Sequence, residues 1–138
     1  MCAASFELHP QLAADTVEVD RWDCCRVLLM NDATYPWLIL VPQRAEVREL
    51  HALSADDLAL ATAEIVRASQ ALERLFQPTK INVAALGNMV PQLHIHVIAR
   101  FEDDAAWPKP VWGVVPATPY DVDDLASRVA ALRDAFAC

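Results

Sequence analysis

Residues 92–98, Gln-Leu-His-Ile-His-Val-Ile, decide how this chain is interpreted, because polar and apolar residues alternate as they do in a half-buried strand. Side chains of a strand point to opposite faces in turn, so Gln92, His94 and His96 are predicted to share one face. The apolar residues between them would anchor the other face to a core. The polar face then carries three nitrogen-bearing side chains about 6.6 Å apart. That arrangement suits a phosphate chain or a metal ion.

Length and charge limit the classes of function. The chain has 138 residues, 55% of them hydrophobic, which is enough for one well-packed domain and too few for two ordinary ones. We therefore expect a single domain over residues 1–138. With 19 acidic and 11 basic residues the net charge is −8, which disfavours non-specific binding to nucleic acid or an anionic membrane. A small phosphorylated ligand held by local groups remains compatible with this charge.

The N-terminus and the cysteines indicate the compartment. The first residues show no basic region followed by an apolar run, and no segment has the length needed to cross a bilayer. Cys2, Cys24, Cys25 and Cys138 form no Cys-x-x-Cys pair, so free thiols are expected rather than a disulfide framework or a zinc knuckle. We expect a cytoplasmic protein that has no membrane partner.

The pattern of apolar residues predicts an α+β fold. Five segments alternate or are short and apolar, as strands are: residues 17–20, 25–30, 37–41, 80–85 and 92–100. Between the third and fourth, Ser54 is a helix cap, apolar residues follow at helical spacing, and Pro78 ends the helix. A second helix is expected over residues 121–136. This order indicates an antiparallel sheet of about five strands with a long helix packed on one face.

The stretch around residues 92–98 resembles the signature of the histidine triad (HIT) family of nucleotide hydrolases and transferases, which is His-x-His-x-His with apolar residues between and after the histidines. Gln92 stands in place of the first triad histidine, while His94 and His96 match the second and third. Residues 87–91 and Arg100 are also similar to the family. A weaker likeness extends over about residues 6–113. The resemblance implies a HIT-like sheet and a homodimer.

The resemblance also implies roles for the motif. His94 would attack the α-phosphorus and become transiently nucleotidylated, which suits an imidazole that is largely neutral near pH 7. Its other nitrogen must then donate to a fixed acceptor, in the family a backbone carbonyl. His96 would donate hydrogen bonds to the non-bridging phosphate oxygens. Gln92 can bind phosphate but cannot exchange a proton near pH 7, so any acid–base duty of the first histidine is lost or moved. Structural histidines bonded to backbone are the alternative interpretation.

Four polar residues are candidates for substrate binding. Asn31 and Asp32 follow an apolar strand where the family faces the nucleotide, although an Asn-Asp pair suits a turn equally well. Asn82 and Asn88 flank the loop between the last two strands and resemble family residues that touch ribose or phosphate. Asn88 also follows a glycine, as turn residues do.

Three further positions bear on the substrate. Met89 stands where many HIT proteins have Ser or Thr, so a hydroxyl that would help to protonate a leaving group is missing. Trp37 stands near a further family histidine. Trp107 is followed by proline, which resembles the C-terminal segment of one HIT branch that reaches the neighbouring subunit's site. Trp107 or Trp112 would therefore wall the pocket, or would pack as an aromatic plug on the core.

These observations favour an enzyme that cleaves a nucleotide at its α-phosphate through a covalent His94 intermediate. Dinucleoside polyphosphate-like substrates are favoured over phosphoramidates, because a phosphate leaving group needs less protonation than an amine. No cofactor and no protein-bound metal are required, although the substrate phosphates can carry Mg²⁺.

Two alternatives remain open. A nucleotide-binding module with little turnover is motivated by Gln92. A metal site built on His94 and His96 needs a third ligand, for which His51 or an acidic residue is the sequence candidate. His51 and His9 otherwise lie outside the motif and are interpreted as surface or capping residues.

Overall fold

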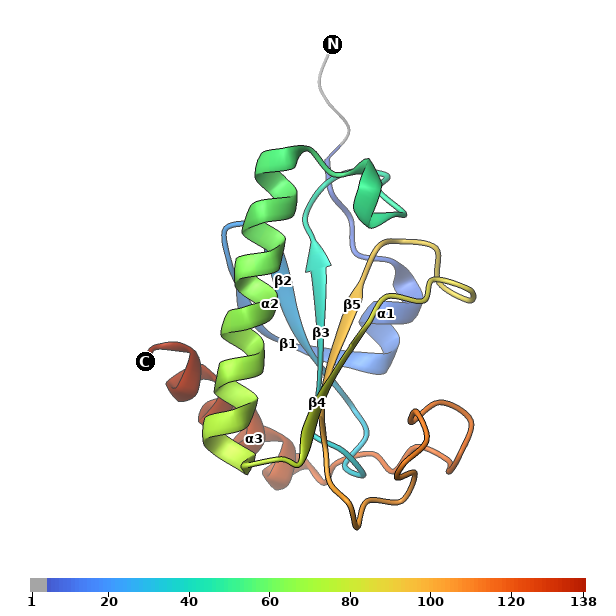
Figure 1. Ribbon diagram of the computed structural model, residues 1–138, viewed down its shortest axis with the longest axis vertical. Helices are drawn as coiled ribbons and strands as arrows, with labels where there is room; N and C mark the ends of the chain where they lie inside the picture. The colour runs from blue at the N-terminus through green and yellow to red at the C-terminus, as the bar shows by residue number, and fades with distance from the viewer. Residues whose placement is uncertain (1–4) are drawn as a thin grey trace.

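Five strands form one antiparallel sheet in the computed structural model, which describes residues 5–138 (Figure 1). The strand order across the sheet is β1-β2-β3-β5-β4. The strands are β1 (Thr16–Arg21), β2 (Cys25–Met30), β3 (Trp37–Pro42), β4 (Lys80–Ala84) and β5 (Ile95–Arg100). The predicted α+β class and five-stranded antiparallel sheet are therefore confirmed.

Three α-helices and one 3-10 helix accompany the sheet within the described residues, and side chains cap the N-termini of two of them. They are α1 (Pro10–Asp15), the short 3-10 helix η1 (Leu50–Ala52), α2 (Ala55–Phe76) and α3 (Val122–Phe136). The Ser54 hydroxyl accepts the Asp57 N–H and caps α2, as predicted. His9 caps α1 by accepting the Gln11 N–H at 3.0 Å. The sequence did not predict α1 or η1, because six and three residues are too few to show a helical repeat.

Both faces of the sheet are buried, as the fully buried β3 and β5 require. One face packs against α2 and α3, in a cluster that includes Val97 of β5, Leu72 of α2 and Leu132 of α3. Figure 1 shows the long α2 running in nearly the same direction as β3. The other face is covered by α1 and by residues 101–121, which we call the tail. Ile98 of β5 packs there.

The start of β5 corrects one prediction. Residues 92–100 were expected to form one strand, but β5 begins at Ile95. The Leu93 N–H donates to the Val47 carbonyl at 2.9 Å instead of joining the sheet, and the Gln92 side chain is bonded to the N-terminal segment. Gln92 therefore does not continue a straight row with the two histidines. Leu93, Ile95 and Val97 do join the core on the α2 side, as the alternation predicted.

The tail is fastened to the sheet by Arg100, which is almost fully buried. Its guanidinium forms an ion pair with Asp104 at 2.8 Å, and it donates to the Asn82 Oδ1 and to the Lys109 carbonyl, each at 2.8 Å. A buried arginine is stable only when its donors are satisfied in this way. The tail is thereby held on the face that carries His96.

No helix among residues 5–138 is long and apolar enough to cross a membrane. Cys24 and Cys25 are buried free thiols and Cys138 is an exposed free thiol. Cys2 lies outside the described residues.

Candidate active site

Two imidazoles lie side by side where the chain enters β5. The ring centroids of His94 and His96 are 4.9 Å apart and their planes are inclined by 71°. His94 is 7% exposed and His96 is 4% exposed. Because His96 precedes Val97, which faces α2, the His96 side chain lies on the opposite face, under the tail. The structure therefore brings together the second and third residues of the predicted triad.

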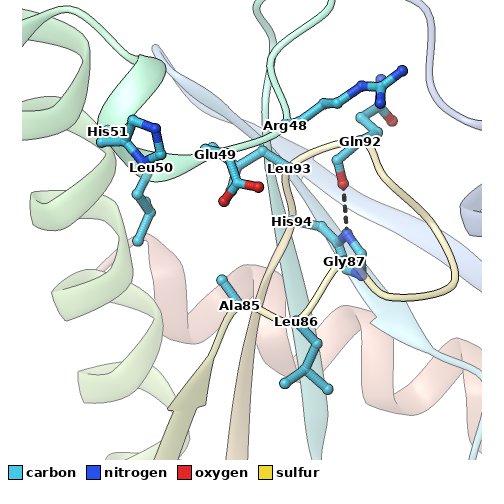
Figure 2. A pocket seen from close by; sticks show the side chains of 10 residues that line it. All are labelled: Arg48, Glu49, Leu50, His51, Ala85, Leu86, Gly87, Gln92, Leu93 and His94. Carbon is cyan, nitrogen blue, oxygen red and sulfur yellow. Dashed lines mark hydrogen bonds between the residues drawn. The ribbon is translucent and has the colours of Figure 1, made fainter.

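The carbonyl of Gln92 determines the tautomer of His94. Nδ1 of His94 lies 2.7 Å from this oxygen, and a dashed line in Figure 2 marks this bond. A carbonyl oxygen can only accept a hydrogen bond, so Nδ1 carries the proton in the neutral ring. Nε2 is then left with a lone pair. A fixed carbonyl acceptor of this kind is what the resemblance implied for a nucleophilic histidine.

Trp37 gives His96 the opposite tautomer. Its indole Nε1–H donates to Nδ1 of His96 at 3.0 Å, and an indole nitrogen has no acceptor capacity. The neutral ring of His96 therefore carries its proton on Nε2. Burial, and secondarily the neighbouring His94, lower the pKa of His96 to about 4. His96 is thus neutral at pH 7.

A cavity of about 280 Å³ opens beside the two histidines. Its lining residues come from the loop before β5, from the histidines and from the tail: Leu86, Gly87, Asn88, Met89, Val90, His94, His96 and Trp112. The Trp112 ring meets His96 edge to face, with the centroids 4.9 Å apart. Of the two predicted tryptophans, Trp112 is therefore the one that walls the cavity. Met89 is 92% exposed at the rim.

A second hollow, of about 140 Å³, also reaches His94. Figure 2 shows that its walls come from η1 and the two residues before it, from the loop after β4 and from the residues before β5. Arg48 and His51 line it, and both are exposed. His94 is therefore reached from an apolar hollow that contains Trp112 and from a more polar one.

The Gln92 side chain is turned away from the histidine pair. Its Oε1 accepts the His9 N–H at 2.9 Å, and its Nε2 donates to the Glu7 carbonyl at 2.8 Å. The amide thus clamps the N-terminal segment. Only the backbone carbonyl of Gln92 bonds to His94.

Two other predicted substrate residues hold the tail. The Asn31 Oδ1 accepts the Tyr120 N–H at 2.9 Å. The Asp32 Oδ1 accepts the Thr34 N–H at 3.0 Å and the Thr118 N–H at 3.1 Å. Asp32 therefore acts in a turn, which was the alternative interpretation of this pair, and both residues also bind the tail, which was not predicted.

Asn82 and Trp107 surround Arg100 rather than the histidines. Asn82 accepts from the Arg100 guanidinium, and this guanidinium lies 5.8 Å from the Trp107 ring centroid. Neither residue lines the two hollows that reach His94. Of the four predicted polar residues only Asn88 lies in the histidine cavity.

Sequence reasoning missed two contacts that shape the site. The bond from Trp37 to His96 joins residues 59 positions apart, so no local spacing reveals it. The binding of the tail by Arg100 was equally hidden, because Arg100 was noted only as a residue after the motif. A buried arginine next to Asp104 at a spacing of four residues is the one local signal that was present.

The metal alternative lacks a third ligand near the histidines. Within residues 5–138, the one group of three potential ligand side chains is Cys24, Cys25 and Glu64, elsewhere in the fold. The Glu64 carboxylate accepts the backbone N–H groups of Cys24 at 2.9 Å and Cys25 at 2.7 Å. Its oxygens thus cap the turn between β1 and β2, which is a structural role.

Comparison with known proteins identifies the family. The sequence matches the HIT domain family over residues 12–103. A histidine triad protein from Bradyrhizobium japonicum is 42% identical, with 96% of this chain and 99% of that chain covered and a TM-score of 0.94. A histidine triad protein from Marinobacter aquaeolei VT8 is 46% identical, with 97% of this chain and 98% of that chain covered and a TM-score of 0.94. A histidine triad protein from Sinorhizobium meliloti 1021 is 41% identical, with 94% of this chain and 96% of that chain covered and a TM-score of 0.91. No curated protein sequence matches. The chain belongs to the histidine triad family.

Proposed function

We propose that this protein is a nucleotide phosphohydrolase or nucleotidyl transferase that cleaves at an α-phosphate through a covalent His94 intermediate. The observation that carries the proposal is the bond between Nδ1 of His94 and the Gln92 carbonyl. It leaves the Nε2 lone pair free on a ring that lines two hollows. A neutral imidazole with one nitrogen held and the other free is prepared for nucleophilic attack.

The reaction proceeds in two displacements. Nε2 of His94 forms a bond to the α-phosphorus, and the bond from phosphorus to the leaving-group oxygen breaks. Water, or another acceptor hydroxyl, then attacks the phosphorus and releases its proton to solvent, and the P–N bond breaks to restore His94. The Nε2–H of His96 donates to a non-bridging oxygen while charge develops on it.

The leaving group follows from the protonation states around the site. His96 is neutral at pH 7 because its pKa is lowered to about 4, the Gln92 amide is turned away, and Met89 offers no hydroxyl. Such a site favours a leaving group that departs as an anion. We therefore propose dinucleoside polyphosphate-like substrates, with Mg²⁺ carried on their phosphates, over phosphoramidates.

Replacement of the nucleophile tests this proposal. In His94→Ala, turnover of dinucleoside polyphosphates should fall by several orders of magnitude while the circular dichroism spectrum is retained, because Ile95 and Val97 still anchor the strand. His51→Ala is the matched control, because it removes an exposed imidazole from the adjoining hollow. Its rate should stay within about tenfold of the wild type.

Acid quenching supplies a second readout. Wild-type protein stopped during turnover should carry the mass of one nucleotidyl group, and His94→Ala should not. Near wild-type turnover by His94→Ala on every active substrate would show that His94 is not the nucleophile.

A second candidate is a nucleotide-binding module with little turnover. The observation in its favour is that Trp112 covers His96, which leaves both histidines almost fully buried. Titration calorimetry with nucleotides beside a turnover assay separates the two functions. Binding in the micromolar range without detectable hydrolysis of any polyphosphate would select the binding module.

A further inference from the structure

We propose that Trp37 is a positioning residue that holds His96 in the neutral tautomer with its proton on Nε2, so that His96 serves the site as a hydrogen-bond donor and not as an acid–base group. The acceptor of the His96 hydrogen bond, a phosphate oxygen, rests on the proposed function. The assignment of the tautomer does not depend on that function.

The position of Trp37 follows from the sheet register. Trp37 begins β3 and lies opposite Ile98, while His96 lies opposite Ile39 two residues along β5. Both side chains point to the face of the sheet beneath the tail, where Trp37 belongs to the apolar cluster with Ile39 and Ile98. Trp37 is 6% exposed, so little water competes for the 3.0 Å bond from its indole N–H to Nδ1 of His96.

Protonation of His96 would break this bond. An imidazolium carries N–H groups on both nitrogens, so its Nδ1–H would face the indole N–H, and two donors would meet at one buried contact. A buried donor that has lost its acceptor destabilises the state that contains it. The Trp37 bond therefore opposes the charged form in addition to burial.

No neighbouring charge compensates for this cost. The titratable group that faces His96 is His94, whose ring is 4.9 Å away and which disfavours a second positive charge. The other elements packed against His96 contribute Trp37 and Trp112, and its strand neighbours are Ile39 and Ala84. Among the hydrogen bonds and ion pairs of residues 5–138, none joins a carboxylate to His96.

In their neutral forms the two rings are complementary. His94 carries its proton on Nδ1 and presents a lone pair on Nε2, whereas His96 carries its proton on Nε2 and presents an N–H. Nδ1 of His96 is occupied by Trp37, and His96 lines the same cavity as His94. A lone pair on His94 and an N–H donor on His96 are thus placed side by side.

Long-range ¹H–¹⁵N correlation spectra of protein labelled with [¹⁵N]histidine report the tautomer directly. In the wild type, His96 should show a protonated Nε2 and a lone pair on Nδ1, unchanged from pH 8 down to pH 5. Trp37→Phe keeps the aromatic ring and removes the donor. It should mix the two tautomers of His96 and raise its titration midpoint by about one pH unit, the scale of one lost hydrogen bond.

Trp112→Phe is the matched control, because Trp112 also meets the His96 ring but forms no hydrogen bond with it. The His96 tautomer should be unchanged in this variant. Since Trp37→Phe can loosen the core, the wild type supplies an independent measurement. The Trp37 indole N–H signal should shift at the pH at which His96 titrates, and its exchange with solvent should be slow above that pH.

The outcomes separate this inference from the proposed function. A wild-type His96 protonated on Nδ1, or identical His96 titrations in the wild type and a folded Trp37→Phe, would overturn the role of Trp37. The expected tautomers in a protein that turns over no nucleotide would support the role of Trp37 and count against the proposed enzyme.

Discussion

Gln92 separates two tasks between its backbone and its side chain. Its carbonyl holds Nδ1 of His94 at 2.7 Å, while its amide bonds to the backbone of residues 7 and 9. In the proposed reaction, a residue with this geometry aligns His94 through its backbone and leaves its side chain outside the chemistry. The absence of a histidine at position 92 is therefore compatible with turnover, provided that the leaving group needs no proton.

Variants at position 92 test this division. Gln92→Ala should lower the free energy of unfolding by about 1–3 kcal/mol, the net value of two hydrogen bonds. Turnover of polyphosphates should change by no more than about tenfold, because the carbonyl remains. Gln92→Glu is the control, since it keeps an acceptor for the His9 N–H and loses the donor to the Glu7 carbonyl. The free energy of unfolding of Gln92→Glu should fall between those of the wild type and Gln92→Ala. A loss of several orders of magnitude in turnover by a folded Gln92→Ala would place the side chain in the reaction.

At the scale of elements, the tail depends on an ionised Asp104. Burial alone would raise the pKa of Asp104, but hydrogen bonds from Arg100 and from the backbone N–H groups of Phe101, Trp107 and Ala106 lower it to about 2, against an ordinary value of 3.8. A pKa that is lower in the folded state adds stability above the unfolded value and loses it as the pH falls through the folded value. The tail should therefore loosen between about pH 4 and pH 2.

Asp104→Asn should cost about 2–3 kcal/mol at pH 7, because the neutral amide leaves Arg100 buried without a counter-charge. The difference from the wild type should shrink at pH 3, where Asp104 begins to take up a proton. Asp103→Asn, an exposed neighbour, is the control and should stay within about 0.5 kcal/mol. Urea unfolding followed by tryptophan fluorescence measures all three proteins. A constant difference between pH 7 and pH 3 would contradict the assigned cause.

The elements with a strong period were predictable from the sequence. Ser54 and the helical repeat after it predicted α2, and the apolar runs predicted β2 and β3. Burial of one or two faces of an element imposes a regular pattern of apolar residues on its sequence. The start of β5 was placed wrongly, since residues 92 and 93 bond to residues 7, 9 and 47 instead of to a strand. Contacts between such distant segments leave no period in the sequence.

The site was predictable only where it depends on local spacing, because contacts between distant segments leave no pattern in the sequence. The spacing of His94 and His96 placed them together, but their tautomers depend on a backbone carbonyl and on Trp37, 59 residues from its partner. Asn31 and Asn82 have the polarity of substrate contacts and instead hold the tail and Arg100. Polarity alone does not distinguish a residue that binds a ligand from one that binds backbone.

At the scale of the molecule, two surfaces remain for a second copy of the chain. β4 lies at the edge of the sheet and pairs with β5 alone, and its Val83 is 49% exposed. Helix α2 also exposes Leu58, Leu60 and Val66, and the small Ala59 and Ala63 beside them are exposed as well. Open strand edges and apolar helix surfaces are normally covered. We therefore predict the homodimer that the family resemblance implies, with α2 and β4 of two copies meeting about a two-fold axis.

Light scattering after size exclusion tests the dimer. At micromolar concentration the wild type should have twice the mass of one 15.3 kDa chain. Val83→Lys places a charge on the open strand edge and should shift the mass toward one chain, because an edge lysine opposes pairing with another strand. Val122→Lys is the matched control, since it makes the same change at a residue of α3 that is 84% exposed. It should leave the mass unchanged. A single-chain mass for the wild type would refute the dimer, and equal dissociation of both variants would refute the assignment of β4 to the interface.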